Sequence, residues 1–123
     1  NIEDIKNNFA NLLYEDTKNL NTSIGIITFD NELYEFAKIL IEKSKIEEDQ
    51  KIILDPTKKI VYEPKAVYLM KTEDCKGLEF AKVYLLGLNL DKIKTFEKAR
   101  SAFVAVTRAM NSLIIFSTND KKN

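Results

Sequence analysis

The strongest constraint on the fold is a set of short segments that are apolar on both faces of a strand. They are SIGIITF (23–29), AVYLMKT (66–72), KVYLLGL (82–88) and SLIIFS (112–117). A strand with one solvated face alternates apolar and polar residues, whereas continuous apolar runs are typical of parallel strands covered by helices. The segments therefore predict a buried, mainly parallel sheet.

Helical patterns lie between these segments. The apolar stripe over residues 2–18 predicts one helix, and Asp30 or Asn31 can cap a second helix. A third helix is expected over 95–110, with five residues facing inward: Phe96, Ala99, Phe103, Val106 and Met110. The segments KIIL (51–54) and KIVYE (59–63) predict two short strands around a proline turn. The alternation of strands and helices predicts a three-layer α/β domain.

The composition excludes several classes of function. The 19 basic and 19 acidic residues balance, so any contact with nucleic acid must be local. The chain has no histidine and one cysteine, which excludes zinc hydrolases and enzymes with a Ser-His-Asp or Cys-His site, and no metal site is predicted. Its three glycines cannot form a phosphate-binding loop. Without a long apolar run or a signal peptide, we expect a cytoplasmic protein with no membrane contact.

Two polar features stand out against this background. The segment CKGLEF (75–80) places charged residues at the mouth of a buried strand, where α/β proteins bind ligands. The only two arginines, Arg100 and Arg108, lie on the third predicted helix and share a sector of about 100° with Thr107. On position alone, this sector is explained by a solvated helix in which Arg100 pairs with Glu97.

KGLEF is followed about two dozen residues later by FVAVTRAM (103–110). Together they resemble the fifth and sixth signature motifs of UvrD/Rep-type superfamily 1 DNA helicases. The segment SIGIITFDNELYEFAKIL (23–40) resembles the fourth motif, and the short connection over 31–66 resembles the helicase IV or HelD-like group. The resemblance implies that residues 1–118 form the second RecA-like motor domain of a longer protein, without its own P-loop. The polar residues 119–123 are expected to form a frayed tail.

The resemblance also implies roles for single residues. Arg108 would be the arginine finger on the γ-phosphate of ATP, Glu79 would bind the ribose, and Gly77 would allow close backbone approach. Four residues would contact single-stranded DNA: Lys76, Cys75, Thr72 and Glu73. Two would support the last helix: Arg100 and Thr107. ATP and Mg²⁺ would be held mainly by a first RecA-like domain, which is the expected partner within the same protein.

Each residue also has a simpler interpretation. Glu79 is explained by an exposed strand edge, Lys76 by a solvated turn, Gly77 by a turn with positive φ, and Cys75 by packing.

Two positions depart from the motifs. Glu73 stands where the family often has a histidine, and Phe29 stands approximately where it often has an arginine. The sequence thus predicts half of an ATP-dependent DNA helicase or translocase, inactive by itself. The alternative is a degenerate helicase-like module that binds DNA or a protein partner without ATP turnover.

Overall fold

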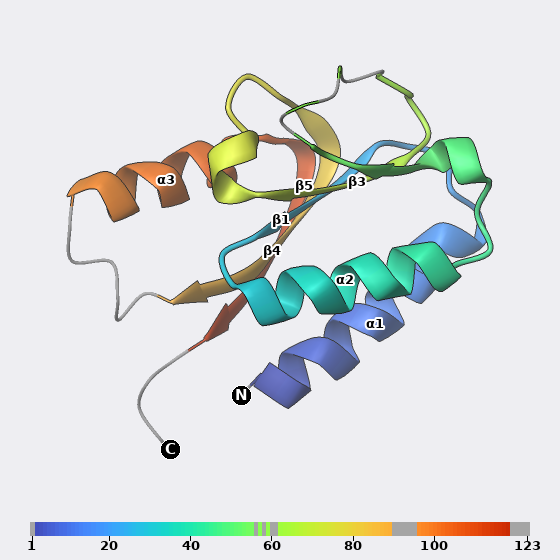
Figure 1. The fold of residues 1–123 in the computed structure, drawn as a ribbon, viewed down its shortest axis with the longest axis horizontal. Coiled ribbons are helices and arrows are strands. Elements are labelled where there is room, and N and C mark those ends of the chain that lie inside the picture. Colours follow the sequence, from blue (N-terminus) through green and yellow to red (C-terminus); the bar gives the residue numbers. More distant parts are fainter. Residues whose placement is uncertain (1, 56, 58, 60–61, 90–95, 119–123) are drawn as a thin grey trace.

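The computed structural model describes residues 2–55, 57, 59, 62–89 and 96–118, and its centre is a parallel sheet (Figure 1). Within these residues the sheet has five strands in the order β2-β3-β1-β4-β5. The bounds are β1 Ile24–Thr28, β2 Lys51–Ile53, β3 Val67–Lys71, β4 Phe80–Asn89 and β5 Ala109–Thr118. Every strand pair is parallel, so the predicted α/β class and buried parallel sheet are confirmed.

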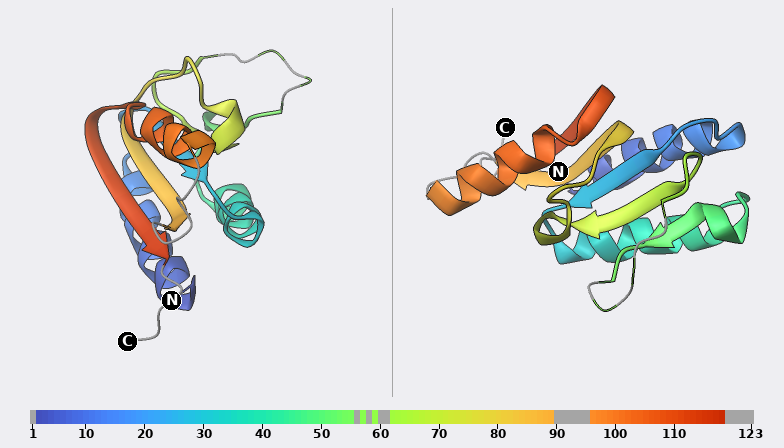
Figure 2. Two further views of the ribbon diagram at one scale, coloured as in Figure 1. Left: turned by 90° about the vertical axis from the view of Figure 1, so that its left-hand side faces the viewer. Right: turned by 90° about the horizontal axis from the view of Figure 1, so that it is seen from above.

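Helices α1 (Ile2–Lys18) and α2 (Asn31–Lys43) cover one face of the sheet (Figures 1 and 2). Their apolar stripes are buried against β1, β3 and β4, as the 3.6-residue period predicts. Asp30, rather than Asn31, caps α2, because its Oδ1 accepts a hydrogen bond of 3.0 Å from the Leu33 amide. Both predicted helices on this face are confirmed.

A buried polar contact fastens α1 to the sheet. The Tyr84 hydroxyl on β4 donates a hydrogen bond to Asp16 on α1, and Lys82 Nζ lies 2.7 Å from the same carboxylate. Burial raises the pKa of Tyr84, and the bond to Asp16 raises it further. The tyrosine therefore stays protonated in the folded state and acts as a donor.

The opposite face is covered by α3 (Phe96–Val106), the one-turn helix η2 (Thr72–Asp74) and the loops around them. The prediction for α3 was wrong in three respects, because the helix ends at Val106, Met110 lies in β5 and Phe103 does not face inward. Phe103 is 68% exposed, while Ala102 and Ala105 face the sheet. Successive helical residues rotate by about 100°, so Phe103 turns away when Ala102 points inward. Val106 is half-buried, and the side chains of Phe96 and Ala99 lie outside the described residues.

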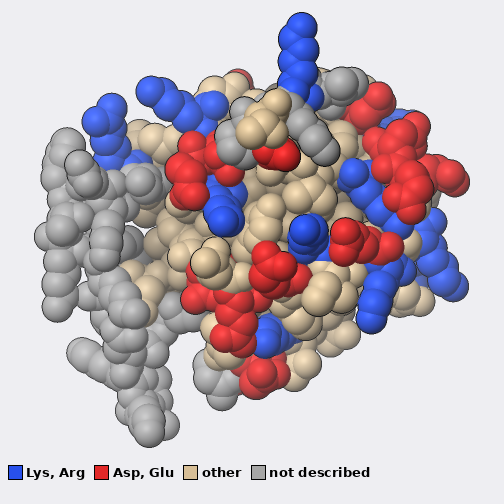
Figure 3. All heavy atoms as spheres, in the orientation of Figure 1, with Lys and Arg blue, Asp and Glu red and all other residues tan. Residues whose placement is uncertain are grey.

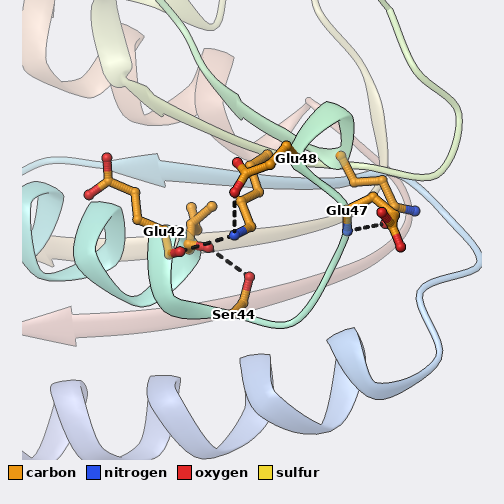
Figure 4. Close-up of polar contacts among 7 residues, drawn as sticks. Glu42, Ser44, Glu47 and Glu48 are labelled. Atoms are coloured by element: carbon orange, nitrogen blue, oxygen red, sulfur yellow. Dashed lines mark hydrogen bonds and ion pairs between the residues drawn. The ribbon is translucent and has the colours of Figure 1, made fainter.

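The connection between α2 and β2 is held by local polar contacts (Figure 4). Lys51 Nζ lies 3.0 Å from the Glu42 carbonyl oxygen and 3.4 Å from a Glu48 carboxylate oxygen, which ties the turn to the end of α2. Glu48 belongs to the short helix η1 (Glu48–Gln50). The turn over 43–51 is thus held by local polar contacts.

The first strand predicted beside the proline turn is confirmed as β2, but its predicted partner and pairing were wrong. β2 pairs in parallel with β3, with Lys51 opposite Val67, and the described part of 59–63 contains no strand. Tyr62 instead stacks on Tyr68, with ring centroids 5.9 Å apart. Ile60 and Val61 lie outside the described residues, as does the predicted tail over 119–123.

Candidate functional site

The two sequence motifs meet at the starts of two neighbouring strands. The Phe80 amide donates a hydrogen bond of 2.9 Å to the Arg108 carbonyl oxygen, and Phe80 pairs with Ala109. Glu79 and Arg108 therefore precede β4 and β5 at the amino-terminal edge of the sheet. The usual ligand-binding edge of a parallel sheet is the carboxyl-terminal one. CKGLEF precedes β4 and therefore lies at the opposite edge. The general rule does not explain the position of this segment.

The segment 72–79 connects both edges of the sheet. It leaves the carboxyl end of β3, crosses β1 on the α3 side, and reaches the amino end of β4. Thr72 and Glu73 lie at its first end, where Thr72 Oγ1 is 3.3 Å from a Glu73 carboxylate oxygen. Lys76 is exposed in the middle turn and Glu79 is exposed at the far end. The residues predicted to contact DNA thus share one short segment with Gly77 and Glu79, two of the three residues predicted to contact ATP.

Cys75 is the predicted DNA contact whose side chain is withdrawn from the surface. The thiol is fully buried in the α3-side core, and its Sγ lies 3.1 Å from the Thr72 carbonyl oxygen that accepts its hydrogen bond. Burial raises the pKa of Cys75, and the nearby Arg108 charge partly opposes that rise. The packing interpretation of the Cys75 side chain is confirmed, and a DNA contact at this position, which stays a prediction, would involve its backbone.

Gly77 occupies a turn that only glycine adopts readily. Its φ is +82°, and a Cβ placed there would have nothing within 4 Å. The positive φ confirms the turn interpretation, and the open space leaves the backbone approachable. Both interpretations of Gly77 are therefore compatible with its geometry.

Arg108 folds back onto the end of α3. Its Nε donates to the Val104 carbonyl oxygen at 3.0 Å, and its Nη2 donates to Thr107 Oγ1 at 3.0 Å. Thr107 Oγ1 in turn donates to Val104 O at 2.8 Å. Among the described residues, no carboxylate forms an ion pair with Arg108, so its charge is held in place without being neutralised.

Arg100 is not gathered with the other two residues of its predicted sector. It is exposed on α3, roughly two turns before Arg108. The helix ends at Val106, so Thr107 and Arg108 lie in the following turn and the sector expected from helical rotation does not extend to them. Thr107 contacts the guanidinium of Arg108, whereas no role for Arg100 follows from its position.

A pocket of about 230 Å³ adjoins these residues, and sequence reasoning did not find it. It is lined by two tyrosines, by the end of the segment 72–79 and by the first residue of β4: Tyr62, Tyr68, Gly77, Leu78, Glu79 and Phe80. The only available signal was a lone tyrosine in a segment that was interpreted as a strand. A larger cavity of about 640 Å³ lies between the ends of α1 and α2, and no residue of KGLEF or FVAVTRAM lines it.

The surface charges do not form an extended basic surface on the face shown in Figure 3, where acidic and basic groups are interspersed. The part of the chain that the structure describes holds no group of His, Cys, Asp and Glu side chains suited to a metal ion. It also has no helix long and apolar enough to cross a membrane.

Comparisons with known proteins place these observations in context. Residues 7–117 match the family model for the viral superfamily 1 RNA helicase core domain. The fold is similar to the C-terminal domain of a possible DNA helicase from Lactobacillus plantarum WCFS1, with 19% identity and a TM-score of 0.64 over 96% of this chain and 69% of that chain. It is also similar to the C-terminal part of the Fun30 ATPase domain, with 10% identity and a TM-score of 0.57 over 94% of this chain and 41% of that chain. A search of curated proteins gave no significant match.

Proposed function

The chain belongs to the viral superfamily 1 RNA helicase core domain family, and on that premise we propose that it is the second motor domain of an ATP-dependent DNA helicase or translocase of the UvrD/Rep type. It would complete an ATP site formed mainly by a first RecA-like domain of the intact protein. The short connection over 31–66 favours the helicase IV or HelD-like group within that type.

One observation carries the proposal. The hydrogen bond between the Phe80 amide and the Arg108 carbonyl oxygen joins KGLEF to the TRA segment, although about two dozen residues separate them. The two segments that resemble helicase motifs are therefore adjacent in space. If the resemblance were due to chance, there would be no reason for KGLEF and the TRA segment to be in contact.

The residues at this edge fit a triphosphate nucleotide held by another domain. Arg108 offers an unneutralised guanidinium, whose planar donors match phosphate oxygens. Its Nη1 makes no hydrogen bond with the described residues, so it can donate to a γ-phosphate while Nε and Nη2 keep the side chain oriented. Glu79 offers an acceptor for ribose hydroxyls, and the Gly77 backbone is open to approach. Mg²⁺ would neutralise phosphate charge when bound with ATP, and no described group of this chain would hold it.

A single strand would contact the other end of the same segment. Lys76 is an exposed cation and Thr72 carries a hydroxyl, both suited to phosphate contacts. With a balanced net charge, this domain alone should bind a strand weakly and lose binding steeply with salt. Because 72–79 also ends at Glu79 beside Arg108, movement of that segment would couple strand contact to the ATP edge.

The test is ATP turnover by the intact protein carrying Arg108→Ala. Loss of an arginine finger should reduce kcat by about 10³-fold or more, with nucleotide binding largely retained. Arg108→Lys should recover little, because an ammonium cannot form the planar bidentate contact. Arg100→Ala is the matched control, since it removes the only other arginine of the chain, which lies on α3, and a much smaller loss is expected. Full turnover by Arg108→Ala would overturn the arginine-finger role.

Glu73 favours a second candidate function. Its exposed carboxylate lies on the segment where a strand would pass and would repel phosphates. A degenerate module that binds DNA or a protein without turnover is consistent with this charge. The two functions separate by measuring strand-stimulated ATPase activity of the intact protein, which only the motor possesses.

A further inference from the structure

The larger cavity lies where α1 and α2 end, on one side of the molecule (Figure 1). Its volume of about 640 Å³ is within the range of about 300–1,000 Å³ that is typical of ligand sites. Its lining comes from the second half of α1 and the two residues after it, from the end of α2, and from the turn that leads to β2. Because no residue of KGLEF or FVAVTRAM is among these, the proposed motor function does not explain the cavity.

The floor of the cavity is apolar and continuous with the core. Leu13 on α1 is buried, and three more lining side chains are partly buried against the same core: Leu20, Leu40 and Ile46. Aliphatic side chains offer no hydrogen bonds, so they select a partner by the apolar area that it brings. The floor therefore favours an apolar side chain.

The rim of the cavity is mainly cationic. The charged residues that line it are Lys18, Lys43, Lys45 and Glu47. Lys18 is paired with Glu15, whose Oε2 lies 2.9 Å from its Nζ. Lys43 and Lys45 are exposed and form no ion pair with the described residues. Two unpaired positive charges therefore stand beside the apolar floor.

Local structure accounts for part of this rim. Glu47 belongs to the capping box that starts η1, so its carboxylate has a role within the turn. Lys18 and Lys43 are the last residues of α1 and α2, where a cation offsets the partial negative charge of the helix end. Lys45 lies beyond the end of α2, and neither explanation covers it.

We propose that this cavity is a docking site for an acidic peptide segment of a protein partner. Carboxylates of the segment would contact Lys43 and Lys45, and an apolar side chain next to them would pack on the floor. Charge complementarity selects this occupant, because the rim carries three lysines and a single glutamate. The inference goes beyond the proposed motor function and does not depend on it.

A single DNA strand is the other polyanion that the lysines would attract. Its bases need flat aromatic surfaces on which to stack, whereas the floor of the cavity is aliphatic. Tyr14 is the one aromatic residue in the lining, and Lys18 Nζ already lies over its ring, 4.8 Å from the centroid. The acidic peptide therefore fits better than the strand.

The experiment measures the fluorescence anisotropy of a labelled peptide, in which three aspartates are followed by leucine and phenylalanine, during titration with the intact protein at low salt. Binding is expected. Affinity should fall by about ten-fold when asparagine replaces every aspartate, because each exposed ion pair contributes only a few-fold. It should also fall by about ten-fold when alanine replaces the leucine and phenylalanine, which tests the apolar floor without changing the core of the protein.

Charge reversal at the rim locates the binding site. The double variant Lys43→Glu, Lys45→Glu should weaken binding of the acidic peptide by about ten-fold. Lys59→Glu is the matched control, because Lys59 is exposed and does not line the cavity, and it should leave the affinity unchanged. Circular dichroism reports whether each variant is folded. Strand-stimulated ATP turnover should be unchanged in the double variant, so failure of the docking site and failure of the motor function appear in different measurements.

The inference has defined ways to fail. Absence of peptide binding, equal affinity for the three peptides, or unweakened binding by the folded double variant would each overturn it. If the double variant loses affinity for oligodeoxythymidylate and not for the peptide, the cavity is a nucleic-acid contact instead. If it loses self-association of the protein and not peptide binding, the occupant is a second copy of the chain.

Discussion

The two faces of the sheet are built differently. The α1/α2 face buries large side chains from both helices in one core with β1, β3 and β4. On the α3 face, the buried side chains that the structure describes on α3 and in the segment 72–79 are small, namely Ala102, Ala105 and Cys75, while Phe103 and Tyr62 are exposed. We call the α1/α2 face the completed face, because its core is formed entirely within the domain. We call the α3 face the working face, because its exposed polar and aromatic groups are suited to contact another surface, such as the proposed first motor domain.

The largest effect should come from the completed face. Phe9 is fully buried and makes edge contacts with Tyr84 and Phe116, whose ring centroids lie 5.4 and 6.1 Å away. Phe9→Ala should lower the free energy of unfolding by about 3–5 kcal/mol, through lost burial and a cavity. Phe103→Ala is the control on the other face and should change it by about 0.5 kcal/mol or less. Denaturant unfolding of both variants measures the difference, and equal losses would contradict the comparison.

The next effect lies within the α3 face of the sheet. Gly25 lies on β1, and a Cβ at this position would come within 2.3 Å of the Phe80 ring. Gly25→Ala should therefore cost about 1–3 kcal/mol by overpacking, and it should displace the residue that follows Glu79. Phe80→Leu in the same chain should relieve part of the clash, giving a measurable coupling energy in a double-mutant cycle. Strict additivity would show that the ring moves aside freely.

A smaller effect concerns the bond that fastens α1. Tyr84→Phe removes the donor to Asp16 while Lys82 stays beside the carboxylate, so the loss should be about 1.5 kcal/mol near neutral pH. Tyr14→Phe, at an exposed position on the same helix as Asp16, should change little.

The same bond gives a pH dependence with a defined sign. The pKa of Tyr84 is raised in the folded state by burial and by Asp16, so the folded chain keeps a proton that the unfolded chain releases near pH 10. The contribution of the protonated Tyr84 to the free energy of unfolding is therefore complete below about pH 10 and is lost as the pH rises above that value. Unfolding measured at about pH 8 and about pH 10.5 should show a shallower decline for Tyr84→Phe than for the unchanged chain. Identical declines would remove Tyr84 as a cause.

The sequence predicted the completed face almost fully and the other face in part. Repeated apolar stripes determine where α1 and α2 bury, because many large side chains agree on one orientation. Among the α3 side chains that the structure describes, the buried ones are alanines, which give a weak signal, so Phe103 was mistaken for an inward residue. The place of Tyr62 in the pocket was not predicted, because it depends on stacking against Tyr68. That contact arises from tertiary packing and leaves no local pattern in the sequence.

The smallest stability effect should come from the residue with the largest proposed functional role. Arg108→Ala removes the side chain that caps the Val104 carbonyl at the end of α3, a contact of a cation with a helix C-terminus worth about 0.3–1 kcal/mol. No carboxylate among the described residues loses a partner, so no uncompensated charge is left behind. Thermal unfolding of the 123-residue chain should therefore change little, while turnover of the intact protein falls by about 10³-fold. A loss of stability as large as that of Phe9→Ala would mean that the Arg108 side chain contributes to the core. The α3 face would then not differ from the α1/α2 face in the way proposed here.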